Sequence, residues 1–508
     1  MRLSMMLFLV LAPAHPPRQS AEAVVRRAFA AIGGEERWRA VRTLELIGRG
    51  SQNHIGDSEW FDGPFFVDYV TVDEWRDVPG IRHDARVTVY GAADTASYAR
   101  RTVSTLGGTT QAVGEFGDKS PSALAPDTLA LVLAPERMLW TALNAPDLHS
   151  ERDTVFRFVT HNVVAFHVGA ASVRIFFEAE SGVPRMMEVR RAFPTSVFWT
   201  AWGDVLERVR YSDWSVEQTG IWYPRQIDRD VNGLPWESMA YGAVRVNAAP
   251  PAGTFDAPTG DGRLACGFGC LAADSVPLGI GGAGGVSSTG ASRGAHEIGA
   301  GIVQIVGAWN STLVRQDDGV VVIEAPISAG YSRRVIEEAA RRFPGVPVKA
   351  VVTTTDFWWH VAGLREYVAR GIPIYVLDRN VRVVQDRVRA PHTLVPDSLA
   401  RAPRPAILKP VDRRMTLGTG DNAIELIPFH ADQLDRMLMV YLPHQHLVYT
   451  AEGVQLYPFG LSAPQTAVEV VNVVKREGLA PERFIGMHVA VTPWARLTTI
   501  LDSLAIPH

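Results

Sequence analysis

One histidine lies where an apolar, β-branched run gives way to a helix-forming sequence. Val351 and Val352 end the apolar run, a short polar and aromatic stretch follows, and His360 comes directly before apolar residues at helical spacing. The run is typical of a buried strand, and the spacing after it is typical of a helix. In α/β proteins, ligands bind at the carboxyl ends of strands. His360 is therefore the first candidate for a role in chemistry.

From about residue 297 to the end, the sequence resembles the metallo-β-lactamase fold. That family carries a His-x-His-x-Asp-His motif at this kind of strand–helix junction, followed by a Gly-Gly-Leu-like helix start. Val361-Ala362-Gly363-Leu364 matches the helix start and fixes the register of the motif. The resemblance implies an α/β fold, an αββα sandwich, and descent from zinc-dependent hydrolases.

In this register His360 takes the last histidine of the motif. Thr355 and Phe357 fall on the first two histidines, and Trp359 falls on the aspartate. Three of the four metal ligands of the motif are therefore replaced by a hydroxyl, a phenyl and an indole group. The resemblance predicts the fold together with a degenerate metal site.

The resemblance also assigns the later ligand positions of the family. Gln433 takes the third histidine, with His430 three residues before it, Glu452 takes the bridging aspartate, and His488 takes the final histidine. The candidate metal ligands are therefore His360, Glu452 and His488, with Asp356 and His430 as two further candidates nearby.

Three interpretations of these residues remain open. A two-zinc hydrolase of esters or lactones would use all five, and Asp356 and His360 would share a face if their turn were helical. A single ion would use His360, Glu452 and His488. In the third interpretation no cofactor binds, because Phe357, Trp358 and Trp359 are bulky where imidazoles should stand and interiors are close-packed. This third interpretation is favoured and predicts a hydrolase-like protein that is catalytically altered or inactive; whether it is an enzyme stays open. The three aromatic residues are also candidates for lining a ligand groove.

The sequence before residue 260 predicts a mainly antiparallel β domain. Short segments alternate apolar and polar residues and are bounded by Gly, Pro, Asn or Asp, as in Val173 to Phe177 and Arg208 to Trp214. Tyr211-Ser212-Asp213-Trp214 and Gly220-Ile221-Trp222-Tyr223-Pro224 loosely resemble the half-barrels of periplasmic lipoprotein carriers, which hold acyl chains. That resemblance implies a lipid or apolar-ligand carrier as another function. Several tryptophans would line such a groove or simply fill the core of a sheet: Trp60, Trp75, Trp199, Trp202, Trp214, Trp222 and Trp236.

The composition is that of a soluble globular protein with two or three domains. The chain has 508 residues, of which 47% are hydrophobic and 20% are charged, and its net charge is −4. This balance gives no reason to expect a nucleic-acid partner. A small-molecule or lipid ligand is expected instead, and the sequence says nothing about a protein partner.

The N-terminus has the layout of a secretory signal peptide. Arg2 precedes an apolar run, and Ala12-Pro13-Ala14 is similar to a cleavage site. The run is too short to span a membrane. We therefore predict a periplasmic or secreted protein. Its predicted parts are a signal peptide at 1–20 with cleavage near 14–21, an antiparallel β domain at 21–260, a Gly/Ser-rich linker at 261–296, and the metallo-β-lactamase-like domain at 297–508.

Two cysteines, Cys266 and Cys270, precede the Gly-rich stretch. In an oxidising compartment this spacing favours a small-loop disulfide, and two free thiols are the alternative. With only these two cysteines, a multi-cysteine zinc cluster is excluded.

Overall fold

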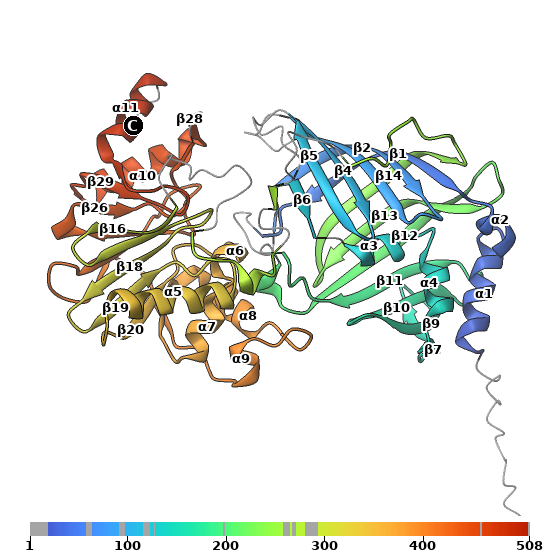
Figure 1. Cartoon of the computed structure of the whole chain (residues 1–508), viewed down its shortest axis with the longest axis horizontal. Helices are drawn as coiled ribbons and strands as arrows, with labels where there is room; N and C mark the ends of the chain where they lie inside the picture. The colour runs from blue at the N-terminus through green and yellow to red at the C-terminus, as the bar shows by residue number, and fades with distance from the viewer. Residues whose placement is uncertain are drawn as a thin grey trace, which may run out of the picture.

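The computed structural model describes residues 19–56, 63–90, 97–114, 122–125, 127–196, 199–257, 265–266, 271–279, 293–457 and 460–505. The chain forms two lobes side by side, an N-terminal lobe (19–257) and a C-terminal lobe (293–505) (Figure 1). The fold is mixed α/β, and most neighbouring strands are antiparallel. Among the described residues no helix is both long enough and apolar enough to cross a membrane. The predicted signal peptide lies almost entirely outside the described residues.

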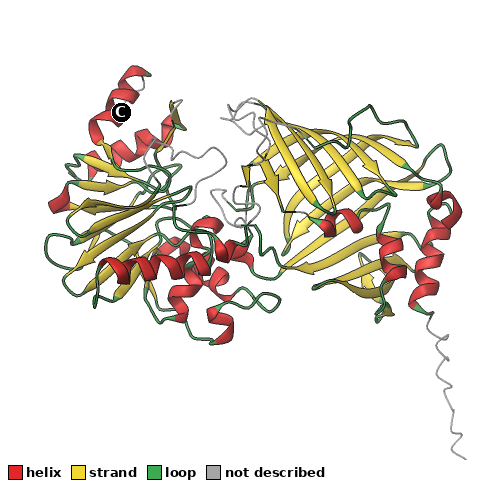
Figure 2. Cartoon of the chain, in the orientation of Figure 1, coloured by secondary structure: helices red, strands yellow, loops and turns green. Residues whose placement is uncertain are grey.

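One large, curved, mainly antiparallel sheet makes up most of the N-terminal lobe (Figure 2). Its strand order is β15-β6-β5-β4-β3-β2-β1-β14-β13-β12-β11-β10-β9-β7, and β8 pairs with β9. The strands are β1 (Thr43–Asn53), β2 (Val67–Asp77), β3 (Arg82–Tyr90), β4 (Tyr98–Thr105), β5 (Gly108–Gly114), β6 (Ser122–Leu124), β7 (His149–Ser150), β8 (Thr154–Phe156), β9 (Val159–Val168), β10 (Ala171–Glu178), β11 (Pro184–Arg191), β12 (Val205–Val216), β13 (Trp222–Val231), β14 (Leu234–Val246) and β15 (Ala265–Cys266).

Alternating side chains give this sheet one buried face. In β10, Val173, Ile175 and Phe177 are fully buried, whereas Ser172 and Arg174 between them are partly exposed. Helices cover the buried face: α1 (Ala21–Ala31), α2 (Glu35–Arg39), α3 (Thr128–Val132) and α4 (Met138–Asn144). The expected antiparallel pattern is therefore present, and it places a curved sheet over a helix-covered core.

Two sheets make up the C-terminal lobe. The first has the order β16-β17-β18-β19-β20-β21-β22, and the second has the order β23-β24-β25-β26-β29-β30. Their strands are β16 (Gly294–Gly299), β17 (Ile302–Val306), β18 (Ser311–Gln316), β19 (Gly319–Ile323), β20 (Val348–Val352), β21 (Ile374–Leu377), β22 (Leu408–Val411), β23 (Met415–Leu417), β24 (Ile424–Pro428), β25 (Leu438–Leu442), β26 (Leu447–Tyr449), β29 (Arg483–Ile485) and β30 (Thr492–Pro493); β27 (Gln455–Tyr457) and β28 (Gly460–Ser462) form a separate hairpin.

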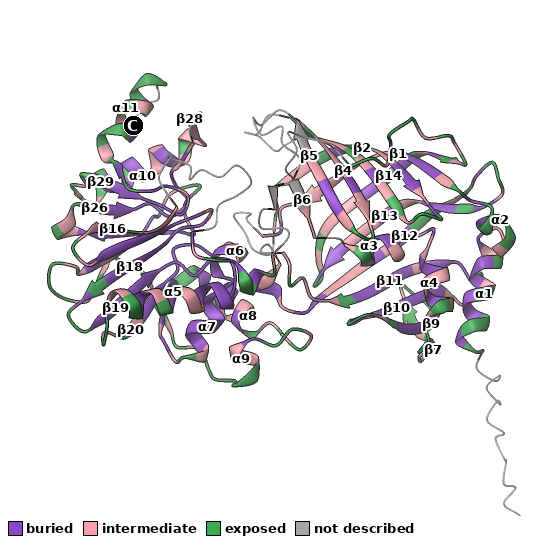
Figure 3. Ribbon diagram, viewed as in Figure 1, coloured by how far each residue is buried: buried purple, intermediate pink, exposed green. Residues whose placement is uncertain are grey.

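The central strands of the first sheet are buried on both faces, as Figure 3 shows. Every residue of β17 and β19 is buried, which explains why their sequences are apolar apart from Gln304, whose side chain donates to the carbonyl oxygen of Val489. Helices lie outside the sheets: α5 (Ala329–Arg342), α6 (Trp358–Val361), α7 (Leu364–Ala369), α8 (Val381–Arg389) and α9 (Ser398–Arg401) on the side of the first sheet, and α10 (Pro464–Arg476) and α11 (Trp494–Ser503) on the side of the second.

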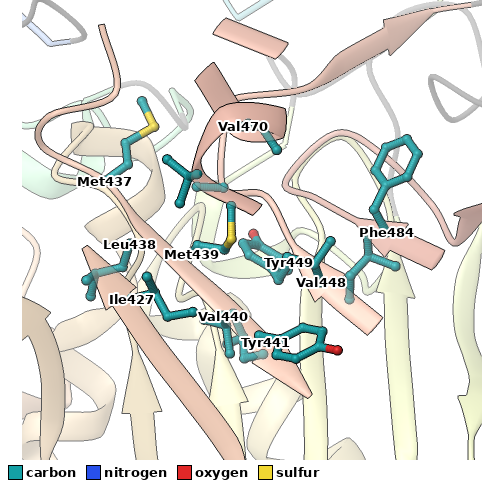
Figure 4. Packing of buried hydrophobic residues seen from close by; sticks show 14 of the residues in the cluster. Ile427, Met437, Leu438, Met439, Val440, Tyr441, Val448, Tyr449, Val470 and Phe484 are labelled. Carbon is teal, nitrogen blue, oxygen red and sulfur yellow. The ribbon is translucent and has the colours of Figure 1, made fainter. Parts of the chain in front are cut away.

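A continuous apolar core joins the two sheets of this lobe. Met439 and Tyr449 of the second sheet belong to the same buried cluster as Val321 and Val352 of the first. Figure 4 shows the part of this cluster built by β24, β25, β26 and α10. The core therefore lies between two facing sheets, with most helices on the outer faces.

Short 3-10 turns complete the fold: η1 (Thr200–Trp202), η3 (Ala273–Ser275), η4 (Asp378–Asn380) and η5 (Pro443–Gln445). Part of the predicted linker, residues 271–279, packs on the C-terminal lobe, where Ala273 and Val276 are buried against α5 and the first sheet. Cys270 lies outside the described residues, so the predicted disulfide stays a prediction.

Candidate functional site

The turn that follows β20 is held by its own threonines. Thr353 Oγ1 donates to the carbonyl oxygen of Thr355 (2.8 Å), and Thr355 Oγ1 accepts from the backbone N–H of Phe357 (3.3 Å). Thr353, Thr354 and Thr355 are all buried. The Thr355 hydroxyl therefore organises the backbone of the turn.

Three of the predicted ligand residues meet at this turn. His360 lies on α6, Glu452 follows β26, and His488 follows β29. His360 Nε2 lies 2.7 Å from Glu452 Oε1, and His488 Nε2 lies 3.0 Å from the same oxygen. One ligand atom from each residue falls within 4.8 Å of the other two. Two imidazoles thus share one carboxylate oxygen.

The group is largely shielded from water. His360 is fully buried, 5% of Glu452 is exposed, and 21% of the His488 side chain is exposed. Burial alone would raise the pKa of Glu452, but the positive charges that His488 and His360 carry when protonated hold it well below its usual range. Burial alone would lower the pKa of His488; attraction to Glu452 outweighs it and raises the pKa. The site therefore favours a carboxylate with a positive charge beside it.

The remaining contacts of the group fix its orientation. His488 Nδ1 lies 2.7 Å from the carbonyl oxygen of Ala308, and Gln455 Nε2 donates to Glu452 Oε2 (2.9 Å). Aromatic rings surround the imidazoles: the ring centroids of Phe357 and Trp359 lie 5.6 and 6.0 Å from that of His360. Phe357 and Trp359 therefore form part of the wall of the site.

The other two candidate ligands do not join this group. Asp356 is buried, and its Oδ2 accepts a hydrogen bond from Arg436 Nε (2.9 Å). His430 is exposed, has a positive φ of 46°, and contributes its carbonyl oxygen to Arg476 (3.3 Å). Gln433, at the third-histidine position, donates its backbone N–H to Glu469 (3.0 Å). The fold therefore does not bring the five candidate ligands together at one centre.

Trp358 points away from the imidazoles and into the N-terminal lobe. Its ring centroid lies 5.0 Å from those of both Trp199 and Trp202, in edge-to-face arrangements. Its backbone N–H donates to the carbonyl oxygen of Gly56 (3.3 Å), and a Cβ at Gly56 would lie 1.6 Å from the Trp358 ring. The motif turn is therefore also a contact between the two lobes.

Other polar contacts between the lobes lie beside this aromatic cluster. Asp204 accepts hydrogen bonds from the backbone N–H groups of Thr393 (3.1 Å) and Leu394 (3.0 Å), and its own N–H donates to Pro391 (2.6 Å). Thr200 Oγ1 donates to the carbonyl oxygen of Ile327 (2.5 Å). These directed contacts specify one orientation of the lobes.

One acidic residue near the group was missed by the sequence reasoning. Glu324, at the end of β19, is fully buried, and its Oε1 accepts from the Thr354 N–H (2.8 Å) and from the Thr354 hydroxyl. Burial raises its pKa to about 8, and Glu452 adds to the rise. A carboxylic acid directly after the apolar run 320–323, at a carboxyl strand end, is the signal that could have found it.

The N-terminal lobe holds a cavity of about 320 Å³. Its wall includes Trp199, Trp236 and Tyr211, together with Arg229 and Glu207. Burial raises the pKa of Glu207, whose nearest ion-pair partner, Arg191, lies 3.8 Å away. Two of the tryptophans expected to line a groove therefore do so, in a cavity that also contains charged groups.

Comparison with known proteins gives weak structural similarities. No protein-family model and no curated protein matches the chain. The stereoselective inverting sec-alkylsulfatase Pisa1 from Pseudomonas sp. is 17% identical over 42% of this chain and 40% of its own length, with a TM-score of 0.31. A metallo-β-lactamase from Pontibacter korlensis is 13% identical over 42% of this chain and 98% of its own, also with a TM-score of 0.31.

A third similar structure is a domain from Vibrio parahaemolyticus described as an outer membrane lipoprotein-sorting protein domain. It is 8% identical over 46% of this chain and 95% of its own length, with a TM-score of 0.30. Similarity at this level does not establish a function for the chain.

Proposed function

We propose that the chain is an altered member of the metallo-β-lactamase-fold hydrolases, in which His360, Glu452 and His488 hold a single zinc-type ion in place of a two-ion hydrolytic centre. The C-terminal lobe would be the family's αββα sandwich, and the N-terminal lobe a half-barrel-like domain. The two facing sheets with helices outside them support the first assignment. The curved antiparallel sheet supports the second.

The orientation of the His488 ring is the observation that carries the proposal. Because Nδ1 lies 2.7 Å from the Ala308 carbonyl oxygen, Nδ1 is assigned the proton and donates it. Nε2 then faces Glu452 Oε1 at 3.0 Å, and an unprotonated Nε2 would place its lone pair against the carboxylate. A proton or a metal ion is therefore needed between these two atoms.

The surrounding groups favour a metal ion over a proton. His360 brings a third donor atom to the same point, and two histidines with one glutamate are a ligand set of catalytic zinc sites. A metal-bound histidine usually donates its other ring N–H to a carbonyl or carboxylate, as His488 does to Ala308. Since metal binding displaces protons from such ligands, it strengthens as the pH rises.

The same residues limit what the centre would catalyse. A zinc ion bound here would supply Lewis-acid chemistry and lower the pKa of a bound water to near 7. Thr355, Phe357 and Trp359 supply neither an imidazole nor a carboxylate for a second ion. We therefore expect the chain to lack the hydrolytic activity of two-ion enzymes, because one of the two ions that polarise the substrate has no ligands.

Metal analysis of the full-length protein tests this proposal. After chelator treatment, reloading with zinc and dialysis, we expect about one zinc per chain by mass spectrometry. We expect His360→Ala and the conservative Glu452→Gln to lose it, and the matched control His430→Ala to retain it. Cobalt substitution gives an independent spectroscopic signal of the same site. Zinc-free wild type, or equal zinc in wild type and Glu452→Gln, would contradict the proposal.

Two further outcomes distinguish the alternatives. Two zinc ions per chain, with turnover of an ester or lactone that disappears in His360→Ala, would support a two-ion hydrolase with a non-standard ligand set. One zinc ion with no turnover of a β-lactam, an aryl sulfate or a lactone would support the altered centre proposed here.

The cavity of the N-terminal lobe favours a second function, the binding of a lipid or another largely apolar ligand. Its volume of about 320 Å³ lies within the range of small-molecule sites, and aromatic rings form part of its wall. Ala85 lines the cavity, so a larger side chain at this position would fill part of the cavity. We expect lipids extracted from the purified protein to decrease in Ala85→Phe and to persist in the control Ala99→Phe, whose site is exposed. No co-purified ligand in wild type would argue against a carrier.

We also propose that the protein is exported, on the layout of residues 1–20. The mass of the mature chain from the periplasm or medium tests this. Cleavage near residues 14–21 is expected, and an intact N-terminus in the cytoplasm would contradict it.

A further inference from the structure

A second cavity, of about 210 Å³, lies between the two lobes behind the motif turn. Ile55, Trp202 and Leu234 line it from the N-terminal lobe, and Phe357, Trp358 and Arg387 line it from the C-terminal lobe. None of His360, Glu452 and His488 lines it. This cavity is therefore distinct from the imidazole–carboxylate group.

The Arg387 side chain makes this cavity chemically unusual. Its guanidinium lies 3.8 Å from the centre of the Trp202 ring, and its Nε is buried without a hydrogen-bond partner among the described residues. No ion pair joins it to an acidic side chain in the described part of the chain. Burial lowers its pKa to about 10, which still leaves it charged at neutral pH. A buried polar group without a partner is costly, so such a group is a candidate for contact with a ligand.

The charge of the cavity wall is positive. Asp356 lines the cavity, but its carboxylate is already bound by Arg436 (2.9 Å). Arg382 lines the cavity as well and adds a second guanidinium. Asp386, the neighbour whose charge acts on Arg387, is exposed and forms no ion pair with it among the described residues, so an anion that enters would meet a guanidinium that no carboxylate binds.

The remaining wall is aromatic and aliphatic. Trp358 and Phe357 come from the motif turn, and Leu234 and Ile55 come from the N-terminal sheet and the turn after it. A planar guanidinium binds carboxylate and phosphate groups through its N–H fork, and flat rings pack against flat or aliphatic bodies. The guanidinium and the apolar side chains therefore line the same cavity.

We propose that this cavity binds a small molecule that carries an oxyanion group (carboxylate, phosphate or sulfate) on a flat apolar body. The oxyanion accepts hydrogen bonds from Arg387, and the apolar body packs against Trp358 and Leu234. Because its walls come from both lobes, the ligand stabilises their contact. The substituted motif turn thus contributes a wall to a binding site.

Calorimetric titration of the full-length protein with 2-naphthoate tests the proposal. We expect one binding site per chain and at least tenfold weaker binding in Arg387→Met, which keeps an apolar stem over Trp202. Arg389→Met is the matched control, since Arg389 lies on the same helix and is exposed. The neutral analogue 2-naphthalenemethanol should bind wild type and Arg387→Met equally weakly.

A second variant keeps the test decisive if Arg387→Met folds poorly. Leu234→Phe adds volume to the cavity wall without changing its charge and should block 2-naphthoate. Naphthoate binding should also raise the Tm of wild type and leave that of Leu234→Phe unchanged. The proposal is overturned if wild type does not bind 2-naphthoate. It is also overturned if Arg387→Met binds the acid as tightly as wild type, or if the neutral alcohol binds as tightly as the acid.

Discussion

Replacement of Glu324 by glutamine should change how stability depends on pH. The pKa of Glu324 rises from 4.5 to about 8 because its carboxyl group is fully buried. The folded state therefore keeps a proton that the unfolded state releases above pH 4.5. Stability linked to this group is fully present below pH 4.5 and is lost as the pH rises to about 8.

The size of the effect follows from the shift. At about 1.4 kcal/mol per pKa unit, a rise of this size corresponds to about 5 kcal/mol between the two ends of the window. Glu324→Gln keeps an oxygen that accepts from the N–H of Thr354 and cannot ionise. Relative to wild type, the variant should therefore gain stability by about 1.4 kcal/mol for each pH unit between 5 and 8.

Urea unfolding at several pH values, followed by the transition that reports on the C-terminal lobe, measures this difference. Glu337→Gln is the matched control, because Glu337 is an exposed glutamate on α5. A stability difference between wild type and Glu324→Gln that stays constant from pH 5 to pH 8 would show that ionisation of Glu324 is not linked to folding. The same pH-dependent difference in Glu337→Gln would show that the effect is not specific to the buried carboxyl group.

Two further predictions concern the packing of the lobes. Gly56→Ala should destabilise the contact between the lobes by about 1–3 kcal/mol, because the added Cβ would overlap the Trp358 ring. Limited proteolysis of this variant should therefore be faster than that of wild type. Gly242→Ala is the control, because a Cβ at Gly242 meets no atom within 4 Å. Glu136→Gln should lower the free energy of unfolding of the N-terminal lobe by about 1–3 kcal/mol in urea, because it removes the charge of one of the two carboxylates that pair with the buried Arg76, at 3.0 Å, and leaves only Glu74 at 2.7 Å. Unchanged proteolysis of Gly56→Ala would contradict the predicted overlap with Trp358. A Glu136→Gln unfolding curve that overlies that of wild type would contradict the predicted contribution of Glu136 to stability.

The residues of the turn that follows β20 make contacts in three directions. Thr355 hydrogen-bonds within the turn, Phe357 and Trp359 stand beside His360, and Trp358 packs in the N-terminal lobe. The turn thus joins the two lobes and contributes to a cavity. The proposed single-ion site and the proposed oxyanion site both use residues of α6, since His360 belongs to the first and Trp358 lines the second.

Local patterns predicted the regular elements of the C-terminal lobe well. The pairing of Leu438–Leu442 with Leu447–Tyr449 and the helices α5, α7 and α10 follow from apolar periodicity and turn residues. The apolar residues from Phe484 to His488 predict a strand, but the strand ends at Ile485, because the chain then turns at Gly486 and Met487 bonds to Ala451. The proline-bounded stretch from Pro391 to Pro405 predicts a loop, but it contains the short helix α9, capped by Asp397.

The sequence alone indicates most of the strands and helices of the C-terminal lobe and places His360 after a strand. Only the tertiary structure decided which side chains meet. His488 bonds to Ala308, 180 residues earlier in the chain, and Trp358 finds its partners in another lobe. Periodicity reports which face of an element is buried, because burial acts on each residue separately. It does not report what lies opposite that face, because the partner comes from a distant segment whose position is set by how the sheets and lobes pack.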